Sequence, residues 1–166
     1  MDVGAAAAAA TTPRPTFNVT FFASPAGWFK IAEIILGLLV FALLAPEGAY
    51  RVHPGLEFVM FVAVFVWILT IVLTVIYMFS LHSTVLSGAP WDVIEFAFNV
   101  FCTLLYFIGA IVESAFVGGI SVWVASTVFA WFLLIVYGCH TLYAYRVWKG
   151  ELSCLGGSNA GNDVNT

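Results

Sequence analysis

Four long apolar blocks make up more than half of this chain and decide what it can fold into. They cover roughly residues 27–45, 58–81, 93–117 and 120–148. An α-helix rises about 1.5 Å per residue, so about 20 residues cross a hydrocarbon core of about 30 Å. Each block has this length or nearly so, and the sequence therefore predicts a membrane protein with four transmembrane helices.

The composition agrees with a membrane protein and excludes several functions. Charged residues make up 8% of the chain and hydrophobic residues 63%, with a mean hydropathy of +1.05, whereas soluble domains contain about 25% charged residues. The net charge of −4 and the five Lys and Arg residues offer no basic patch that could follow a phosphate backbone. We therefore expect no nucleic acid partner.

The expected fold is an all-α membrane protein, a four-transmembrane-helix bundle with short loops and disordered tails. The domain is expected over residues 25–149, with spans at about 26–45, 57–81, 93–117 and 120–148. Gly118 and Gly119 lie between the last two blocks and favour a tight turn with positive φ, so those helices should be antiparallel neighbours. Residues 1–24 and 150–166 are predicted to be tails.

The distribution of basic residues predicts the orientation of the bundle. Four spans place both tails on one side of the membrane, and that side carries Arg14, Lys30, Arg146 and Lys149. The opposite side carries Arg51 alone. Because Lys and Arg near helix ends resist translocation, both tails are predicted to be cytoplasmic.

A stripe of polar and small residues follows the third block. Its members, 3 or 4 residues apart, are Glu95, Asn99, Cys102, Tyr106, Gly109 and Glu113. This spacing keeps them on one helix face, which must point at the other helices because a charge at mid-bilayer costs at least ~2.5–3.5 kcal/mol. Two interpretations stay open: a proton or ion path, or a hydrogen-bonded seam whose two glutamates extend to opposite interfaces. The two carboxylates lie about 27 Å apart along the helix, too far to act as a pair.

A second polar group is predicted in the cytoplasmic half of the bilayer. Its residues come from three blocks and are Lys30, Glu33, Glu95, Asn99 and His140. They could form one cluster, or Lys30 and Glu33 could be an interfacial ion pair. His140 could sense pH, because histidine titrates near 6.5, or it could be an interfacial residue.

Small residues on three blocks favour close helix packing. They are Gly37, Ala110, Ser114, Ser126 and Ala130. Packing within one chain and a homo-oligomer interface are both compatible with them. Four tryptophans are expected near the interfaces: Trp28, Trp91, Trp123 and Trp148.

The cysteines and motifs give no sign of catalysis. Cys102 and Cys139 are predicted to be small core residues, and Cys154, beyond the fourth block, is a candidate for S-palmitoylation. The sequence contains no Ser-His-Asp set with a nucleophile turn, no His-Glu-x-x-His, no Cys-x-x-Cys and no Gly-rich phosphate loop. We therefore expect no catalytic residues, metal site or cofactor.

Several segments resemble the MARVEL-domain tetraspan proteins, closest to the group of plasmolipin, the MAL proteins and the chemokine-like factors. They are residues 31–40, residues 58–65, Pro90-Trp91 with Phe98-Asn99, and the tail around 147–150. The resemblance covers about residues 28–148.

This resemblance implies a non-enzymatic protein of cholesterol- and sphingolipid-rich membranes. It would act in vesicle trafficking and in apical or myelin-type membrane sorting, in the plasma membrane and in endosomal or Golgi vesicles. Its partners would be membrane lipids, a second copy of itself or a client membrane protein. Two alternatives stay open: a channel or proton-linked transporter that uses the polar stripe, and an accessory chaperone of another membrane protein.

Overall fold

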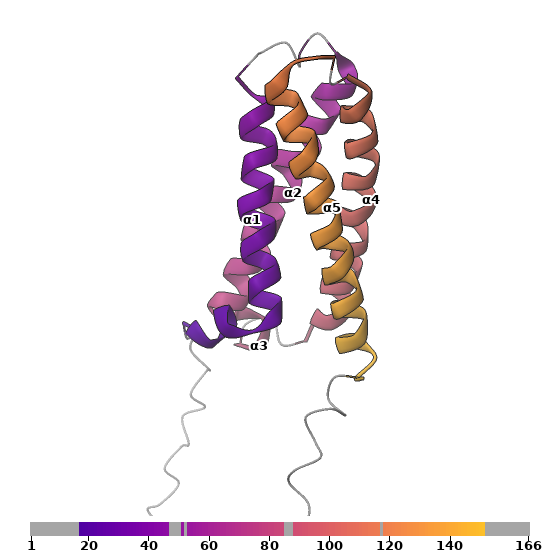
Figure 1. The fold of residues 1–166 in the computed structure, drawn as a ribbon. Coiled ribbons are helices and arrows are strands. Elements are labelled where there is room, and N and C mark those ends of the chain that lie inside the picture. The colour runs from indigo at the N-terminus through magenta and orange to yellow at the C-terminus, as the bar shows by residue number, and fades with distance from the viewer. Residues whose placement is uncertain (1–16, 47–50, 52, 85–87, 117, 152–166) are drawn as a thin grey trace, which may run out of the picture.

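The computed structural model describes residues 17–46, 51, 53–84, 88–116 and 118–151 and contains four long helices. These are α1 (Pro25–Leu44), α2 (Pro54–Met78), α4 (Trp91–Phe116) and α5 (Ser121–Trp148) (Figure 1). All four are long and apolar enough to cross a membrane, and their ends lie within three residues of the expected spans. The prediction of an all-α, four-helix membrane bundle is confirmed.

Each of the four helices packs against two neighbours, in the order α1, α2, α4, α5 around the bundle. The last two form an antiparallel hairpin (Figure 1), and Gly118 and Gly119 in the turn have φ of +44° and +88°. The predicted role of this glycine pair is confirmed. α1 and α2 also approach closely, because a Cβ atom added to Gly37 would lie 3.2 Å from Cδ1 of Trp67.

The beginning of α1 follows from local chemistry, whereas the end of α2 differs from the expectation. The Ser24 hydroxyl accepts a hydrogen bond from the Gly27 N–H at 3.1 Å, and Pro25 occupies the first helical position. α2 ends at Met78 and not at residue 81. Ser80 adopts a φ of 51°, which turns the chain into the short helix α3 (Leu81–Thr84). Apolar residues continue through this turn, so hydropathy could not locate it.

Residues 17–24 differ from the expectation that they form part of a tail. A 3-10 helix, η1 (Val19–Ala23), lies against the end of α2. The Asn18 N–H donates to the Met78 carbonyl at 2.8 Å, and the Phe21 and Tyr77 rings stack with centroids 5.8 Å apart. Aromatic side chains explain this packing, since they bury more surface against the bundle than they would in a free tail.

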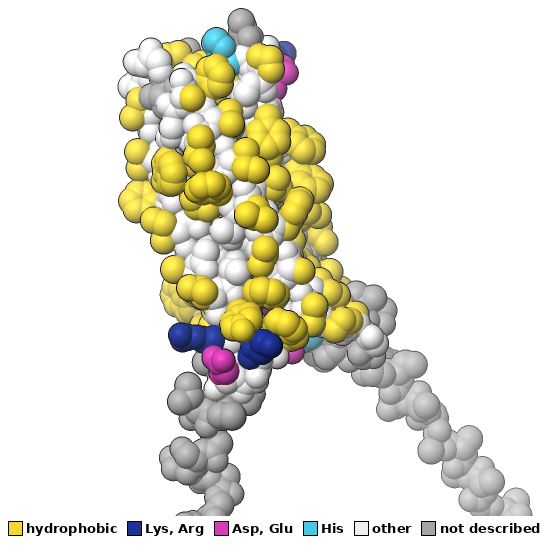
Figure 2. Space-filling model, turned by 90° about the vertical axis from the view of Figure 1, so that its right-hand side faces the viewer, with side chains coloured by type: hydrophobic (Ala, Val, Ile, Leu, Met, Phe, Trp, Pro, Cys, Tyr) yellow, Lys and Arg dark blue, Asp and Glu magenta, His cyan; other side chains and the backbone are white. Residues whose placement is uncertain are grey.

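The outer surface of the bundle is apolar. Large hydrophobic side chains stay exposed on every long helix, for example Ile35 at 53%, Phe61 at 62%, Leu104 at 57% and Ile135 at 59%. Figure 2 shows such side chains over most of the height of one face, with Lys, Arg, Asp and Glu side chains at its two ends. A surface of this kind is suited to lipid and not to water.

The buried core contains most of the small residues that were expected to bring helices together. Gly37, Ala110, Ser126 and Ala130 are buried. Ser114 is exposed instead, although its hydroxyl accepts a hydrogen bond from the Trp131 indole N–H at 3.2 Å and so still connects α4 to α5.

Two further residues depart from the expected positions. Cys139 is exposed, whereas Cys102 is buried as predicted. Trp123 is 3% exposed and packs in a second small core beside Leu44 and Leu56, so it does not contact lipid at the interface. Both residues lie on α5. The inward and outward faces of this helix are almost equally apolar, so its rotation cannot be read from hydropathy.

Candidate functional site

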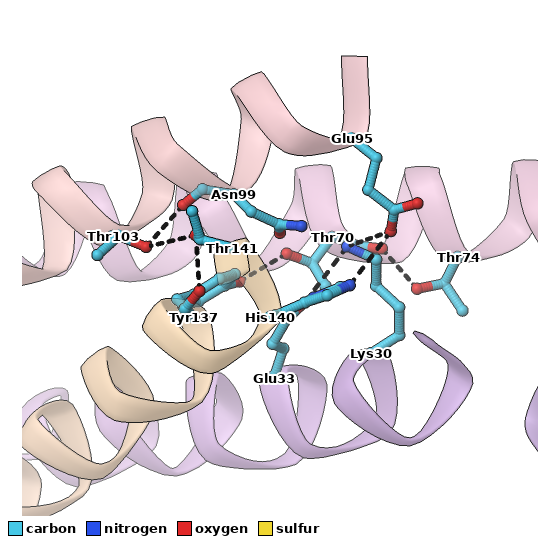
Figure 3. A network of polar contacts seen from close by, with 10 residues as sticks. All are labelled: Lys30, Glu33, Thr70, Thr74, Glu95, Asn99, Thr103, Tyr137, His140 and Thr141. Atoms are coloured by element: carbon cyan, nitrogen blue, oxygen red, sulfur yellow. Dashed lines mark hydrogen bonds and ion pairs between the residues drawn. The ribbon is translucent and has the colours of Figure 1, made fainter. Parts of the chain in front are cut away.

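Charged residues of three helices meet inside the bundle and form what we call the ion cluster. Lys30 and Glu33 lie on α1, Glu95 on α4 and His140 on α5 (Figure 3). The side chains of Lys30, Glu33 and His140 are fully buried, and that of Glu95 is 16% exposed. The helix spacing explains this, because residues 30 and 33 share the inner face of α1 with Gly37 and Val40.

Acid and base alternate around the ion cluster. Lys30 Nζ lies 3.4 Å from Glu33 Oε2 and 3.6 Å from Glu95 Oε1. His140 Nδ1 lies 2.5 Å from Glu33 Oε1, and its Nε2 lies 3.4 Å from Glu95 Oε1. Each carboxylate therefore contacts both bases, and the four charges balance when His140 is protonated. The arrangement ties α1, α4 and α5 to one another.

Three interpretations of these residues are corrected by this geometry. Lys30 and Glu33 form a buried pair and not an interfacial one, and His140 is not an interfacial residue. Glu95 points toward Lys30 and His140 instead of extending to the membrane surface (Figure 3). The physical reason is that a partner helix supplies the counter-charge. Burying a paired charge costs less than burying an isolated one.

Aromatic rings flank the ion cluster. The Phe29 ring stacks on the His140 imidazole, with centroids 4.8 Å apart and planes 10° from parallel. The Lys30 ammonium lies 5.2 Å from the centroid of the Phe98 ring, in reach of a cation–π contact. Phe29 and Phe98 do not stand out in the sequence, because 17% of the chain is aromatic.

Asn99 lies beside the ion cluster but is not bonded to it. Its side chain is fully buried, and neither amide atom has a hydrogen-bond partner in the described part of the chain. Its backbone carbonyl accepts from the Thr103 hydroxyl at 2.7 Å. The structure therefore brings Asn99 to the edge of the ion cluster (Figure 3).

A second set of hydroxyl groups continues the polar interior beyond Asn99. Tyr137 and Thr70 share a hydrogen bond of 2.8 Å between α5 and α2, and Thr103 and Thr141 share one of 3.1 Å between α4 and α5. Tyr137 is not among the site residues predicted from the sequence. It lies three residues before His140, in a series of buried residues spaced three or four apart along α5. This spacing is the signal that could have identified it.

A small cavity lies beside the ion cluster, toward one end of the bundle. It has a volume of about 90 Å³ and is lined by Ala26, Asp92, Glu95, Tyr143, Ala144 and Val147. α1 begins and α5 ends here, and Asp92 in the first turn of α4 adds a second carboxylate. Glu95 is the member of the ion cluster that lines this opening.

The rest of the α4 stripe is buried between the helices. Cys102, Tyr106, Gly109 and Glu113 all face the interior. Glu113 has no exposed surface, so the interpretation that it extends to the opposite interface is wrong. The packing of α5 against α4 covers this position, and that packing cannot be read from the sequence of α4.

Four membrane-length helices, a lipid-facing apolar surface and charges enclosed between the helices define an integral membrane protein of the four-span class. Residues 21–143 match the MARVEL family, described as a membrane-associating domain. The chain belongs to this family, as the sequence resemblance predicted.

Relatives from three vertebrates match most of the chain. Human plasmolipin is 36% identical over 163 residues, which cover 93% of this chain and 85% of plasmolipin. CKLF-like MARVEL transmembrane domain-containing protein 8 of Mus musculus is 34% identical over 147 residues, covering 85% and 84%. MARVEL domain-containing protein 1 of Xenopus laevis is 32% identical over 144 residues, covering 80% and 81%. No solved structure matches the chain.

Proposed function

We propose that this protein organises cholesterol- and sphingolipid-rich membrane domains and takes part in vesicle trafficking or membrane sorting, without catalysing a reaction. The observation that carries the proposal is the apolar outer surface of all four helices, with the charged groups enclosed inside. Interactions of the described residues are therefore directed mainly at lipid and at other membrane-spanning helices.

Helix length supports a preference for thick bilayers. α2, α4 and α5 have 25, 26 and 28 residues, which corresponds to about 38–42 Å of helix. The hydrocarbon core of sterol-rich plasma membranes is about 32–33 Å thick, against about 27 Å in the endoplasmic reticulum. Less tilt is needed to match these helices to the thicker membrane. Trp28 and Trp148 are exposed at one end of the bundle and are suited to fix its depth.

The proposed orientation places both tails in the cytoplasm, with the protein in the plasma membrane and in endosomal or Golgi vesicles. The start of α1 and the end of α5 lie at the same end of the bundle (Figure 1). Arg146 and Lys149 at the end of α5 give that end positive charge that favours the cytoplasmic side.

Partitioning in giant plasma-membrane vesicles tests the proposed function. We expect the full chain to be enriched in the ordered phase, and we expect Cys154→Ser to reduce this enrichment because an acyl chain on Cys154 would favour ordered lipid. Cys154 lies outside the described residues. Cys139→Ser is the matched control, since Cys139 is an exposed cysteine within a span and should leave the partitioning unchanged.

Equal partitioning of the wild-type protein between the two phases would contradict the proposal. That result would favour the alternatives, a channel or proton-linked transporter built on the α4 stripe or a chaperone of another membrane protein.

A further inference from the structure

Glu113 occupies an unusual position, because it is a fully buried carboxyl group that no described residue bonds. Its exposed surface is 0%, and neither Oε1 nor Oε2 has a hydrogen-bond partner among the described residues. The ion cluster cannot neutralise it, since Glu95 lies 18 residues earlier on the same helix, or about 27 Å away. An ionised carboxylate left alone in such surroundings costs several kcal/mol.

Ser126 is the polar side chain that α5 presents to Glu113. Its hydroxyl proton is already used, because Ser126 Oγ donates to the Val40 carbonyl on α1 at 2.9 Å. A hydroxyl group has one proton but two lone pairs. While its proton is directed at the Val40 carbonyl, Ser126 can only accept a hydrogen bond from Glu113, and a carboxyl group can donate one only when it is protonated.

The structure leaves open space beside Gly109, one helical turn before Glu113. A Cβ atom added to Gly109 would meet no heavy atom within 4 Å, yet Gly109 is buried. Side chains on a helix tilt toward its N-terminus, so the Glu113 side chain is directed to the Gly109 side of its own Cα, and its atoms stay more than 4 Å from a Cβ position at Gly109. The Tyr106 hydroxyl is also buried, and no residue in the described ranges bonds it. Buried polar atoms without protein partners are usually satisfied by enclosed water.

We propose that Glu113 is a proton-binding site inside the membrane: a neutral carboxylic acid, hydrated by water held beside Gly109. The carboxyl O–H donates to Ser126 Oγ or to this water, and the second carboxyl oxygen accepts from the water. The inference goes beyond the proposed function and does not rest on it.

Among the described residues, no other titratable or charged group bonds to the Glu113 carboxyl oxygens in place of the proposed proton. Tyr106 lies on the same helix. Arg51 and His53 precede α2, Glu57 lies in its first turn, and all three are exposed. α1 presents Val40 and Leu44 in this half of the bundle, and α5 presents Ser126 and Trp123. None of the hydrogen bonds found for these groups in the described chain satisfies the Glu113 oxygens.

Infrared spectroscopy of the full chain in lipid nanodiscs tests the proposal. At pH 7 we expect the carbonyl stretch of a protonated carboxylic acid, shifted in D₂O and lost in Glu113→Gln. Glu95→Gln is the matched control on the same helix and should retain the band, because Glu95 is ion-paired. Absence of the band in the wild type, or its survival in Glu113→Gln, would overturn the proposal.

The water is tested separately by Gly109→Ala, which fills the space with a methyl group. We expect the carbonyl band to move to higher frequency as the acid loses a hydrogen-bond partner. Gly138→Ala is the control, since a Cβ there also meets no atom within 4 Å but lies on α5; it should leave the band in place. An unshifted band in Gly109→Ala would contradict the hydrated site.

If Glu113→Gln does not fold, the wild-type chain still decides the question. Solid-state NMR of protein labelled with ¹³C-glutamate should resolve carboxyl carbons from six glutamates. We expect the Glu113 carbon, assigned through its neighbours in the chain, to have the chemical shift of a protonated acid at pH 7. The shift of an ionised carboxylate at Glu113 would overturn the proposal.

Discussion

Replacing Lys30 with methionine is expected to lower the free energy of unfolding by about 3–5 kcal/mol, the usual cost of removing one partner from a buried ion pair. Lys30 contacts both Glu33 and Glu95, so the variant leaves two buried carboxylates with His140 as their remaining counter-ion. Methionine retains most of the length and apolar volume of the lysine stem. The measurement is unfolding by titration with sodium dodecyl sulfate, followed by circular dichroism.

Lys149→Met is the control for the same chemical change. Lys149 is exposed at the same end of the bundle, with its ammonium 4.8 Å from the centroid of the Trp148 ring, and its replacement should change stability by about 0.5 kcal/mol or less. Adding Glu33→Gln to Lys30→Met should restore part of the loss, because it removes one of the two unbalanced charges. Equal effects of Lys30→Met and Lys149→Met would show that the ion cluster does not form.

The second large effect is expected from Leu133→Ala, at about 2–5 kcal/mol. Leu133 is fully buried in the core that also contains Val66 and Tyr137. Inside a bilayer, lipid chains are as apolar as leucine, so the loss arises from packing and not from transfer to water. The free energy of unfolding in the same detergent titration measures it.

Leu142→Ala makes the identical change on the lipid-facing side of α5. Leu142 is 66% exposed, so lipid replaces the missing atoms and the loss should stay below about 1 kcal/mol. The difference between the two variants therefore reports the rotation of α5 about its axis. A larger loss for Leu142→Ala than for Leu133→Ala would place the opposite face of α5 in the core.

Much of the fold could be predicted from the sequence because length and hydropathy suffice to identify membrane-spanning helices. The tight α4–α5 hairpin follows from Gly118 and Gly119, since few other residues tolerate positive φ. Polar residues on a 3 and 4 residue spacing also identify the inner face of α4, because lipid cannot satisfy them.

The details of the candidate site could not be predicted because they depend on contacts between helices. Glu95 and His140 could be placed at similar depth, but whether they meet depends on the rotation of α5, which is apolar on nearly all sides. From the sequence of α4 alone, Glu113 is expected to extend to the interface, whereas in the structure α5 covers it. The turn at Ser80 depends on backbone geometry and not on hydropathy.

Contact between His140 and the two glutamates tests most directly the claim that the ion cluster joins α1, α4 and α5 inside the membrane. In solid-state NMR of the ¹⁵N- and ¹³C-labelled full chain in lipid bilayers, we expect through-space correlations from the His140 imidazole nitrogens to the carboxyl carbons of Glu33 and Glu95. The distances of 2.5 Å and 3.4 Å between nitrogen and oxygen are well within range. Absence of both correlations in protein that retains its helices would contradict the claim.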